Sequence, residues 1–436
     1  MSHPEALSTN AKRSIWAAFL GFFVDMFDVY LPIVALGPAI QYFQPKSMPS
    51  TVSTTIYFVV FAISLIGRPL GATIFGHYAD KIGRKRTTQI SVTGFAIVTL
   101  LIALLPGYQQ IGIWGLVLLT FLRLLDGIFL GGEYTSASPL AMEYCPQSKR
   151  GFYGALIMGG FPAAYVAISL VTAFVLNIVP IAGGLNSPYV QWGWRIPFII
   201  GALIAFVFVW YFSRTVQESE LWLESKKASS PLKELFTGDN AKNFWQVFIL
   251  MSGFWFTLNS TVSTLPGLLI NYLKIPSSVV TNGFLVINVF LFLGYLSAGV
   301  ISQKMGRRPF LISMGILTTV VGSLLYWYLL STVTNNAGKA LFLAGILEIL
   351  CISVWGLATT YINERFHTSV RASGFGLGYS LAVIIPSFYS FFMLWLSNLM
   401  PYQYTAVVLV VLGGLLTTIG AALGPETKNV IFRAEK

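Results

Sequence analysis

Seven charged side chains lie inside long apolar stretches of the sequence, where they could carry a proton or hold a charged solute. They are Asp25, Asp28, Arg68, Arg123, Asp126, Glu133 and Glu348. A charge inside a membrane span costs at least ~2.5–3.5 kcal/mol to insert, so such residues are functional candidates by default. A carboxylate held by a guanidinium stays ionised, whereas one that loses this partner in a dry environment takes up a proton.

Two of these acids are expected to act close together. Asp25 and Asp28 are three residues apart, so a helix places them on one face. At about 1.5 Å per residue both lie near the middle of their span, and Arg123 reaches a similar depth from the other direction. Asp126 follows Arg123 by one helical turn and could orient its guanidinium. A static ion pair that only neutralises buried charge is the alternative.

Twelve apolar segments would position these charges. The 436 residues are 55% hydrophobic and 10% charged, with a mean hydropathy of +0.72, which is far from the balance of soluble domains. About 20 helical residues cross a hydrocarbon core of roughly 30 Å. We place the spans at residues 15–40, 53–75, 88–105, 114–138, 152–177, 196–213, 244–270, 280–302, 310–333, 340–362, 373–398 and 402–424. The sequence thus predicts an all-α membrane protein. Its polar residues 1–10 show no cleavable signal pattern, so the first span is expected to remain.

The net charge of +11 is explained by membrane topology rather than by nucleic-acid binding. Of the lysines and arginines outside the spans, 21 fall on the side of the termini and 4 on the other. The positive-inside rule then places both termini in the cytoplasm, with the chain in the cytoplasmic membrane and in contact with lipid. The two cysteines and three histidines are scattered, so neither a metal nor a cofactor is expected.

Short patterns recur at a nearly constant offset and indicate a duplicated chain. The segment Gly76–Lys85 is echoed by Gly299–Arg308 at an offset of 223, and Glu143–Arg150 by Glu364–Arg371 at an offset of 221. Two parallel six-helix halves place a solute site near midplane between them. We expect an N-terminal bundle over residues 1–213, a charged cytoplasmic linker over 214–243, and a C-terminal bundle and tail over 244–436.

Charged residues near the cytoplasmic ends of the spans form a candidate gate, whose ion pairs would form in one state and break in another. Asp80 is placed in the turn of the repeated pattern, and Arg68 and Glu133 near the cytoplasmic ends of their spans. Ordinary pairing at a helix end, worth about 0–1 kcal/mol each, is the alternative. The gate candidates are Arg68, Asp80, Arg84, Glu133, Glu143, Arg150, Arg307, Glu364 and Arg371.

The pattern Gly-x-x-x-Asp-x-x-Gly-Arg-Lys at residues 76–85 resembles the signature of the major facilitator superfamily. Four further motifs resemble the metabolite:proton symporter family: Arg68–Ala72, Gly131–Tyr134, Lys149–Gly151 and Gly193–Phe198. In the second half Gln303 replaces the aspartate of the repeated loop. Residues 424–428 are similar to the tail of sugar porters, but residues 251–266 lack the paired glutamines of a sugar site.

The resemblance implies a proton-coupled symporter that imports a small polar metabolite by alternating access, most simply an organic acid or a zwitterionic osmolyte. It carries the roles of proton site and opposing arginine onto Asp28 and Arg123. The spacing of Asp25 from Asp28 makes Asp25 a further candidate for the proton site. A sugar:proton symporter, a uniporter and an exporter share this architecture. Members of the fold commonly work as monomers, with a small-molecule substrate and protons as their partners.

The solute itself is left open by the residues. Arg123 could bind a carboxylate in a bidentate way, although the midplane acids outnumber it and keep a zwitterion, a cation or a neutral sugar possible. The repeat places Glu348 at the counterpart of Asp126, as a substrate or proton site, with a hydrogen-bonded structural glutamate as the alternative. The substrate-site candidates are Arg123, Glu348, Tyr30, Tyr57, Asn259, Trp255, Trp355 and Tyr379; with 15% aromatic content, core or lipid-facing positions are the common alternative. The spans hold no nucleophile-and-base set, which argues against an enzyme.

Overall fold

The computed structural model describes residues 7–48, 50–181, 184–225, 229–332 and 336–434. Every regular element within these ranges is helical, and they contain no strand, so the all-α prediction is confirmed. Ten helical runs in the described part of the chain are long and apolar enough to cross a membrane. The two other predicted spans coincide with the helical runs Ser50–Ile82 and Gly238–Asn271.

The N-terminal half consists of long helices joined by short turns. Its helices are α1 (Thr9–Leu31), α2 (Ser50–Ile82), α3 (Arg84–Ala103), α4 (Tyr108–Ile111), α5 (Trp114–Tyr144), α6 (Arg150–Met158), α7 (Gly160–Ile178) and α8 (Arg195–Thr215). The region predicted as a linker holds two short helices, α9 (Glu220–Glu224) and α10 (Pro231–Leu235).

The helices of the C-terminal half are more often interrupted. They are α11 (Gly238–Leu258), α12 (Leu265–Asn271), α13 (Ser277–Met305), α14 (Arg307–Leu317), α15 (Ser323–Thr332), α16 (Ala337–Ile352), α17 (Ala358–Arg365), α18 (Arg371–Ser380), α19 (Ile384–Ser387), α20 (Tyr389–Leu396) and α21 (Tyr402–Leu423). A π turn over Asn259–Ser263 separates α11 from α12, and a 3₁₀ turn over Ser353–Leu357 separates α16 from α17. Such breaks are frequent at functional sites, and these two carry the candidates Asn259 and Trp355.

Helix α2 continues past the predicted end of its span and corrects the expected position of Asp80. The helix runs to Ile82 and stops at Gly83, whose φ of 110° is a conformation that side chains other than glycine's rarely adopt. Asp80 therefore lies in the last turn of α2 rather than in the turn that follows. Gly306, the repeat counterpart of Gly83, ends α13 with a φ of 107°.

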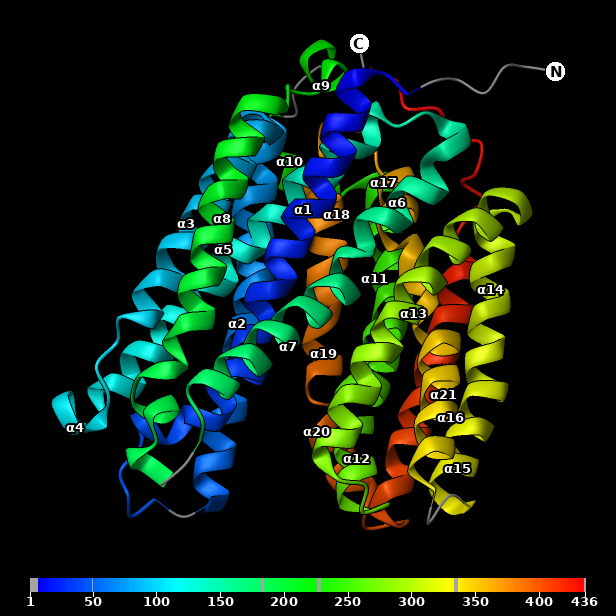
Figure 1. The fold of residues 1–436 in the computed structure, drawn as a ribbon. Coiled ribbons are helices and arrows are strands. Elements are labelled where there is room, and N and C mark those ends of the chain that lie inside the picture. Colours follow the sequence, from blue (N-terminus) through cyan, green and yellow to red (C-terminus); the bar gives the residue numbers. More distant parts are fainter. Residues whose placement is uncertain (1–6, 49, 182–183, 226–228, 333–335, 435–436) are drawn as a thin grey trace.

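The helix bundle has its two chain ends on the same side (Figure 1). The start of α1, the short helices α9 and α10 and the segment after α21 all lie at this end, which we call the terminal face. The opposite end carries α4, α12 and α20. This arrangement agrees with an even number of spans.

Close packing between α2 and α5 sets the position of Arg68. A Cβ on Gly131 would lie 2.3 Å from the backbone oxygen of Arg68, and one on Gly127 would lie 2.0 Å from that of Ser64. Only glycine at these positions lets the two backbones approach so closely. Arg68 is thereby held against the interior face of α5.

Candidate functional site

Arg68 forms a buried ion pair with Asp25 of α1. Its Nη2 lies 2.5 Å from Asp25 Oδ1, and the two side chains are 3% and 0% exposed. Within the described residues, Arg68 Nε and Asp25 Oδ2 have no hydrogen-bond partner. The pair therefore keeps one donor and one acceptor available for another ligand.

Glu133 belongs to the same group of charges. It is fully buried, lies within electrostatic range of Asp25 and Arg68, and neither of its oxygens has a hydrogen-bond partner in the described part of the chain. Arg68 and Glu133 were predicted beside Asp80 at the gate. The structure instead groups both with Asp25, because α2 and α5 extend further toward the terminal face than expected and leave these residues deep in the bundle.

The predicted approach of Arg123 to Asp28 is present. Arg123 Nη1 lies 3.3 Å from Asp28 Oδ2 and 2.6 Å from Asp126 Oδ2, so Asp126 does hold the guanidinium as expected. Thr99 of α3 donates a 2.6 Å hydrogen bond to the other oxygen of Asp28. This group is assembled from α1, α3 and α5, all in the N-terminal half.

Asp25 and Asp28 thus share a helix but bind different arginines. The pairing of Asp25 with Arg68 was missed, although the depth of each residue could have revealed it. Asp25 lies 16 residues beyond Thr9, and Arg68 lies 14 residues before Ile82 on an antiparallel neighbour. At about 1.5 Å per residue these depths are roughly 24 Å and 21 Å from the terminal face.

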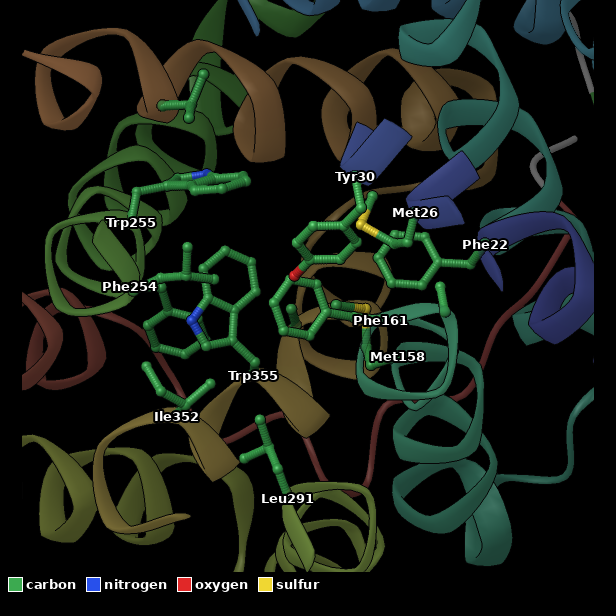
Figure 2. Packing of buried hydrophobic residues seen from close by; sticks show 14 of the residues in the cluster. Phe22, Met26, Tyr30, Met158, Phe161, Phe254, Trp255, Leu291, Ile352 and Trp355 are labelled. Carbon is green, nitrogen blue, oxygen red and sulfur yellow. The ribbon is translucent and has the colours of Figure 1, made fainter. Parts of the chain in front are cut away.

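Three of the predicted substrate residues form an aromatic cluster in the C-terminal half. The ring centroids of Trp255 and Trp355 are 4.8 Å apart. The ring centroid of Tyr379 lies 5.5 Å from that of Trp255 and 5.8 Å from that of Trp355, and all three pairs are edge to face. Trp255 Nε1 donates a 2.9 Å hydrogen bond to the Tyr379 carbonyl. Figure 2 shows Trp255 and Trp355 on one side of the core, facing Tyr30 on the other.

Tyr134 of α5 joins this cluster to the charges of the N-terminal half. Its ring lies 4.9 Å from that of Tyr379, and the Arg68 guanidinium carbon lies 5.5 Å from its centroid. The Tyr134 hydroxyl also hydrogen-bonds to Ser380 of α18. A guanidinium, a carboxylate and an aromatic cluster therefore meet where the two halves touch. Tyr134 was named only as part of a motif, because a lone tyrosine gives no signal of such a role.

The other substrate candidates occupy different surroundings. The ring of Tyr30 packs against those of Phe161 and Tyr165, with centroid distances of 5.7 Å and 5.1 Å. Asn259 donates a 3.0 Å hydrogen bond to the Pro386 carbonyl, which ties it to the backbone. The side chain of Tyr57 lies outside the described residues. Glu348 is 0% exposed and stands apart from the ion pairs.

At the terminal face, Asp80 reaches across from α2 to the start of α18. Its Oδ1 accepts a hydrogen bond from the Ala372 amide at 3.1 Å, and its Oδ2 accepts from the Ser373 amide at 2.9 Å and the Ser373 hydroxyl at 2.8 Å. A carboxylate at a helix N-terminus is favoured by the free amides and by the helix dipole. Asp80 thus fastens the N-terminal half to the C-terminal half.

Glu143 links two arginines beside Asp80. One oxygen pairs with Arg84 of its own half and the other with Arg371 of the opposite half. Arg84 also lies 3.8 Å from Asp80 and donates a 3.0 Å hydrogen bond to the Thr368 carbonyl. Asp80, Arg84, Glu143 and Arg371 are therefore brought together as predicted.

The second repeat builds a similar network with one weaker member. Arg307 pairs with Glu364 at 3.3 Å, as Arg84 pairs with Glu143. Gln303 occupies the place of Asp80 and accepts a 3.0 Å hydrogen bond from the Gly151 amide near the start of α6. A neutral amide gains less from a helix N-terminus than a carboxylate does. We call these two contacts between the halves crossings: Asp80 with the start of α18, and Gln303 with the start of α6. The crossing made by Asp80 uses a carboxylate, and the one made by Gln303 uses a neutral amide.

Arg150 extends the network toward the C-terminal segment. It donates a 2.7 Å hydrogen bond to the Val430 carbonyl, and its guanidinium carbon lies 3.5 Å from the centroid of Phe432. Arg371 lies 4.0 Å from the same ring. The contribution of this tail was missed, because one exposed-looking aromatic after the last span carries no recognisable pattern. Among the described residues, no group of three or more potential ligands could hold a metal ion.

Comparison with known proteins agrees with this architecture. Residues 18–377 match the family model described as Major Facilitator Superfamily. The chain is 30% identical to a putative metabolite transport protein of Haemophilus influenzae, over 97% of this chain and 98% of that one. It is 29% identical to the proline/betaine transporter of Escherichia coli, covering 94% and 83% of the two chains. It is 30% identical to the Escherichia coli α-ketoglutarate permease, covering 86% and 85%.

Solved structures support the same fold. A proton:xylose symporter, XylE, bound to 6-bromo-6-deoxy-D-glucose, superposes with a TM-score of 0.75 at 16% identity over 97% of both chains. A partially occluded, inward-open form of XylE from Escherichia coli superposes with a TM-score of 0.69 at 16% identity, covering 98% of this chain and 100% of that one. At this level of identity the likeness concerns the fold alone. By its family match, its relatives and its fold, the chain belongs to the major facilitator superfamily and is a multi-pass membrane transporter, not an enzyme.

Proposed function

We propose that this transporter is a proton-coupled symporter that imports a small zwitterionic or carboxylate-bearing metabolite by alternating access. The observation that carries the proposal is the pair of buried acid–arginine groups on α1, one of which adjoins an aromatic cluster at the junction of the halves. Charged side chains at this depth are costly to insert and are functional candidates by default. The positive-inside count supports a cytoplasmic terminal face in the cell membrane, and the fold supports a monomer in lipid.

The two acid–arginine groups suit different tasks. Arg68 is the better ligand for a solute carboxylate, because it adjoins Tyr134 and retains an unpartnered Nε among the described residues. Arg123 was predicted for this role but sits with Asp28, Asp126 and Thr99 inside the N-terminal half. We therefore assign the coupling proton to Asp28: when Arg123 shifts toward Asp126, the carboxylate loses its partner and binds a proton.

The aromatic cluster favours a cationic group at the other end of the solute. Trp255, Trp355 and Tyr379 pack edge to face, and a desolvated ammonium over the face of such a ring gains ~0.5–2 kcal/mol per interaction. With Arg68 nearby for the carboxylate, a betaine-like zwitterion matches best, and one relative is a proline/betaine transporter. A dicarboxylate is the second candidate, because Arg68 recognises carboxylates and another relative is an α-ketoglutarate permease.

The terminal-face network supplies one gate of the transport cycle. Asp80, Glu143 and Arg371 join the halves in this structure, so their contacts must break before the central site opens to that side. The solute would enter from the opposite end while this gate is closed. A transporter of the same architecture could also export its solute, so the test also measures the direction of transport.

Purified protein in liposomes with an imposed inward proton gradient would test the proposal. The panel contains radiolabelled glycine betaine, proline, α-ketoglutarate and xylose. We expect gradient-driven accumulation of the zwitterions, abolished by a protonophore. Accumulation of xylose would favour the sugar alternative, and uptake that only equilibrates would establish a uniporter and overturn proton coupling.

A further inference from the structure

Glu348 of α16 is a buried acid that the proposed mechanism does not use. It is 0% exposed, and neither of its oxygens has a hydrogen-bond partner among the described residues. Glu133 is similarly placed but has Arg68 and Asp25 within range. In the described part of the chain, no charged side chain interacts with Glu348. Glu348 thus takes part in none of the ion pairs that the described residues form.

The polar groups around Glu348 come from both halves. Four tyrosines and one thiol lie within electrostatic range, and they belong to α1, α7, α13, α15 and α16: Tyr30, Tyr165, Tyr295, Tyr326 and Cys351. The Tyr326 hydroxyl is already committed, because it donates a 2.9 Å hydrogen bond to the Ser260 carbonyl. Figure 2 shows Tyr30 projecting from α1 toward the side of the core formed by Trp355.

An ionised carboxylate in this place would be unpaired. Moving a lone carboxylate into a dry interior costs several kcal/mol even after relaxation, and such a group takes up a proton instead. None of these five groups carries a positive charge, and neither carboxyl oxygen of Glu348 has a hydrogen-bond partner among the described residues, so nothing there offsets a negative charge.

We propose that Glu348 is a second proton-carrying site, located in the C-terminal half and controlled by the opposition of the two halves. The inference rests on the proposed symport function and adds a proton-binding residue to it. Tyr30 and Tyr165 belong to the N-terminal half, so rocking of the halves withdraws them from Glu348, which stays with Tyr295. Water then replaces them, the carboxyl O–H bond breaks, and the proton passes to that water as the carboxylate becomes solvated.

The transport test compares the wild type with Glu348→Gln, which resembles the protonated acid in size and neutrality. The matched control is Glu224→Gln, the same substitution at an exposed glutamate of α9. In proteoliposomes loaded with glycine betaine, the proton gradient at which net solute flux stops gives the proton-to-solute ratio. We expect Glu348→Gln to lower this ratio by one proton while keeping solute counterflow, and Glu224→Gln to keep the wild-type ratio.

The possible outcomes separate this inference from the symport proposal. Equal ratios in the wild type and Glu348→Gln would overturn the Glu348 site and leave proton symport standing. Wild-type uptake that ignores the proton gradient would overturn symport itself, and this inference with it.

Infrared spectroscopy of the purified proteins gives a readout that needs no transport. The protonated carboxyl band at neutral pH should lose one component in Glu348→Gln and none in Glu224→Gln. Identical bands in wild type and Glu348→Gln would show that Glu348 carries no proton, whatever the variant's transport activity.

Discussion

At the scale of single residues, the two acid–arginine groups differ in how completely their charges are satisfied. Arg123 faces both Asp28 and Asp126, so it can leave one acid without becoming unpaired. Among the described residues, Arg68 forms an ion pair with one acid, Asp25, and its guanidinium lies over the ring of Tyr134. The first arrangement is suited to switching between two acids, and the second to accepting an additional anionic ligand.

Asp28→Asn should abolish solute accumulation driven by a proton gradient, because an amide cannot exchange a proton at physiological pH. Exchange of labelled for unlabelled solute, with equal proton concentrations on both sides, should persist because the substitution leaves the solute-binding site intact. Both are measured in proteoliposomes, with Asp239→Asn as the control because that acid is 90% exposed and pairs with Lys242 at the surface. Full gradient-driven uptake by Asp28→Asn would remove Asp28 from the coupling mechanism.

Trp355→Leu should weaken a betaine-like solute more than a dicarboxylate. The leucine keeps an apolar side chain but lacks a π face, so the ammonium loses ~0.5–2 kcal/mol, or about 2- to 30-fold in affinity. The measurement is competition by glycine betaine and by α-ketoglutarate in the same binding assay. Phe391→Leu serves as the control, since Phe391 is 64% exposed on the outer surface. Equal losses for both solutes would argue against a cation-binding cluster.

At the scale of elements, helix termini at the terminal face are closed by residues distant in sequence. Glu218 accepts a 3.0 Å hydrogen bond from the Lys85 amide at the start of α3. Glu426 accepts from the amides of Arg307 and Arg308 at the start of α14, at 2.8 Å and 3.0 Å. Each half thus uses an acid that follows its last helix to cap its own third span.

The sequence alone could predict the spans, the repeat and the pair of Asp28 with Arg123, because all three follow from hydropathy, spacing and depth. It could not predict these caps. Glu218 and Glu426 are separated by 208 residues rather than by the 221 to 223 of the motifs, since the segments that follow the two halves differ in length. Nor did spacing indicate that Phe432 contacts two arginines, since no periodic pattern extends beyond α21.

Phe432→Ala should loosen the terminal face. The ring lies against Arg150 of one half and Arg371 of the other, so its removal costs roughly 1–2 kcal/mol of contact between them. The reporter is Ala137→Cys in a background without native cysteines, because Ala137 lines a small cavity between the halves with Thr359. Labelling by an impermeant maleimide from the terminal face should rise by about 5- to 30-fold. Ile431→Ala, at a 60% exposed neighbour, should leave labelling unchanged; equal labelling of Phe432→Ala and wild type would contradict the role of the ring.

At the scale of the whole molecule, two of the contacts that join the halves at the terminal face occupy equivalent places in the repeat but differ in charge. Asp80 binds the start of α18 through a carboxylate, whereas Gln303 binds the start of α6 through a neutral amide. The closed state of this face therefore depends more on the crossing made by Asp80. The superfamily fold allows the halves to rock as bodies, so a change at this crossing is expected to shift the balance between two global states.

Asp80→Asn should shift the molecule toward the state that is open at the terminal face. The amide removes the charge that interacts with the α18 dipole and offers a single acceptor oxygen where two now serve Ala372 and Ser373. A loss of roughly 1–2 kcal/mol changes the ratio of the two states by about 5- to 30-fold. Maleimide labelling of the Ala137→Cys reporter from the terminal face should rise accordingly, and labelling from the opposite side should fall. Because both changes are measured on one cysteine, a rise from both sides would indicate general loosening instead, and unaltered labelling would show that Asp80 does not hold the gate.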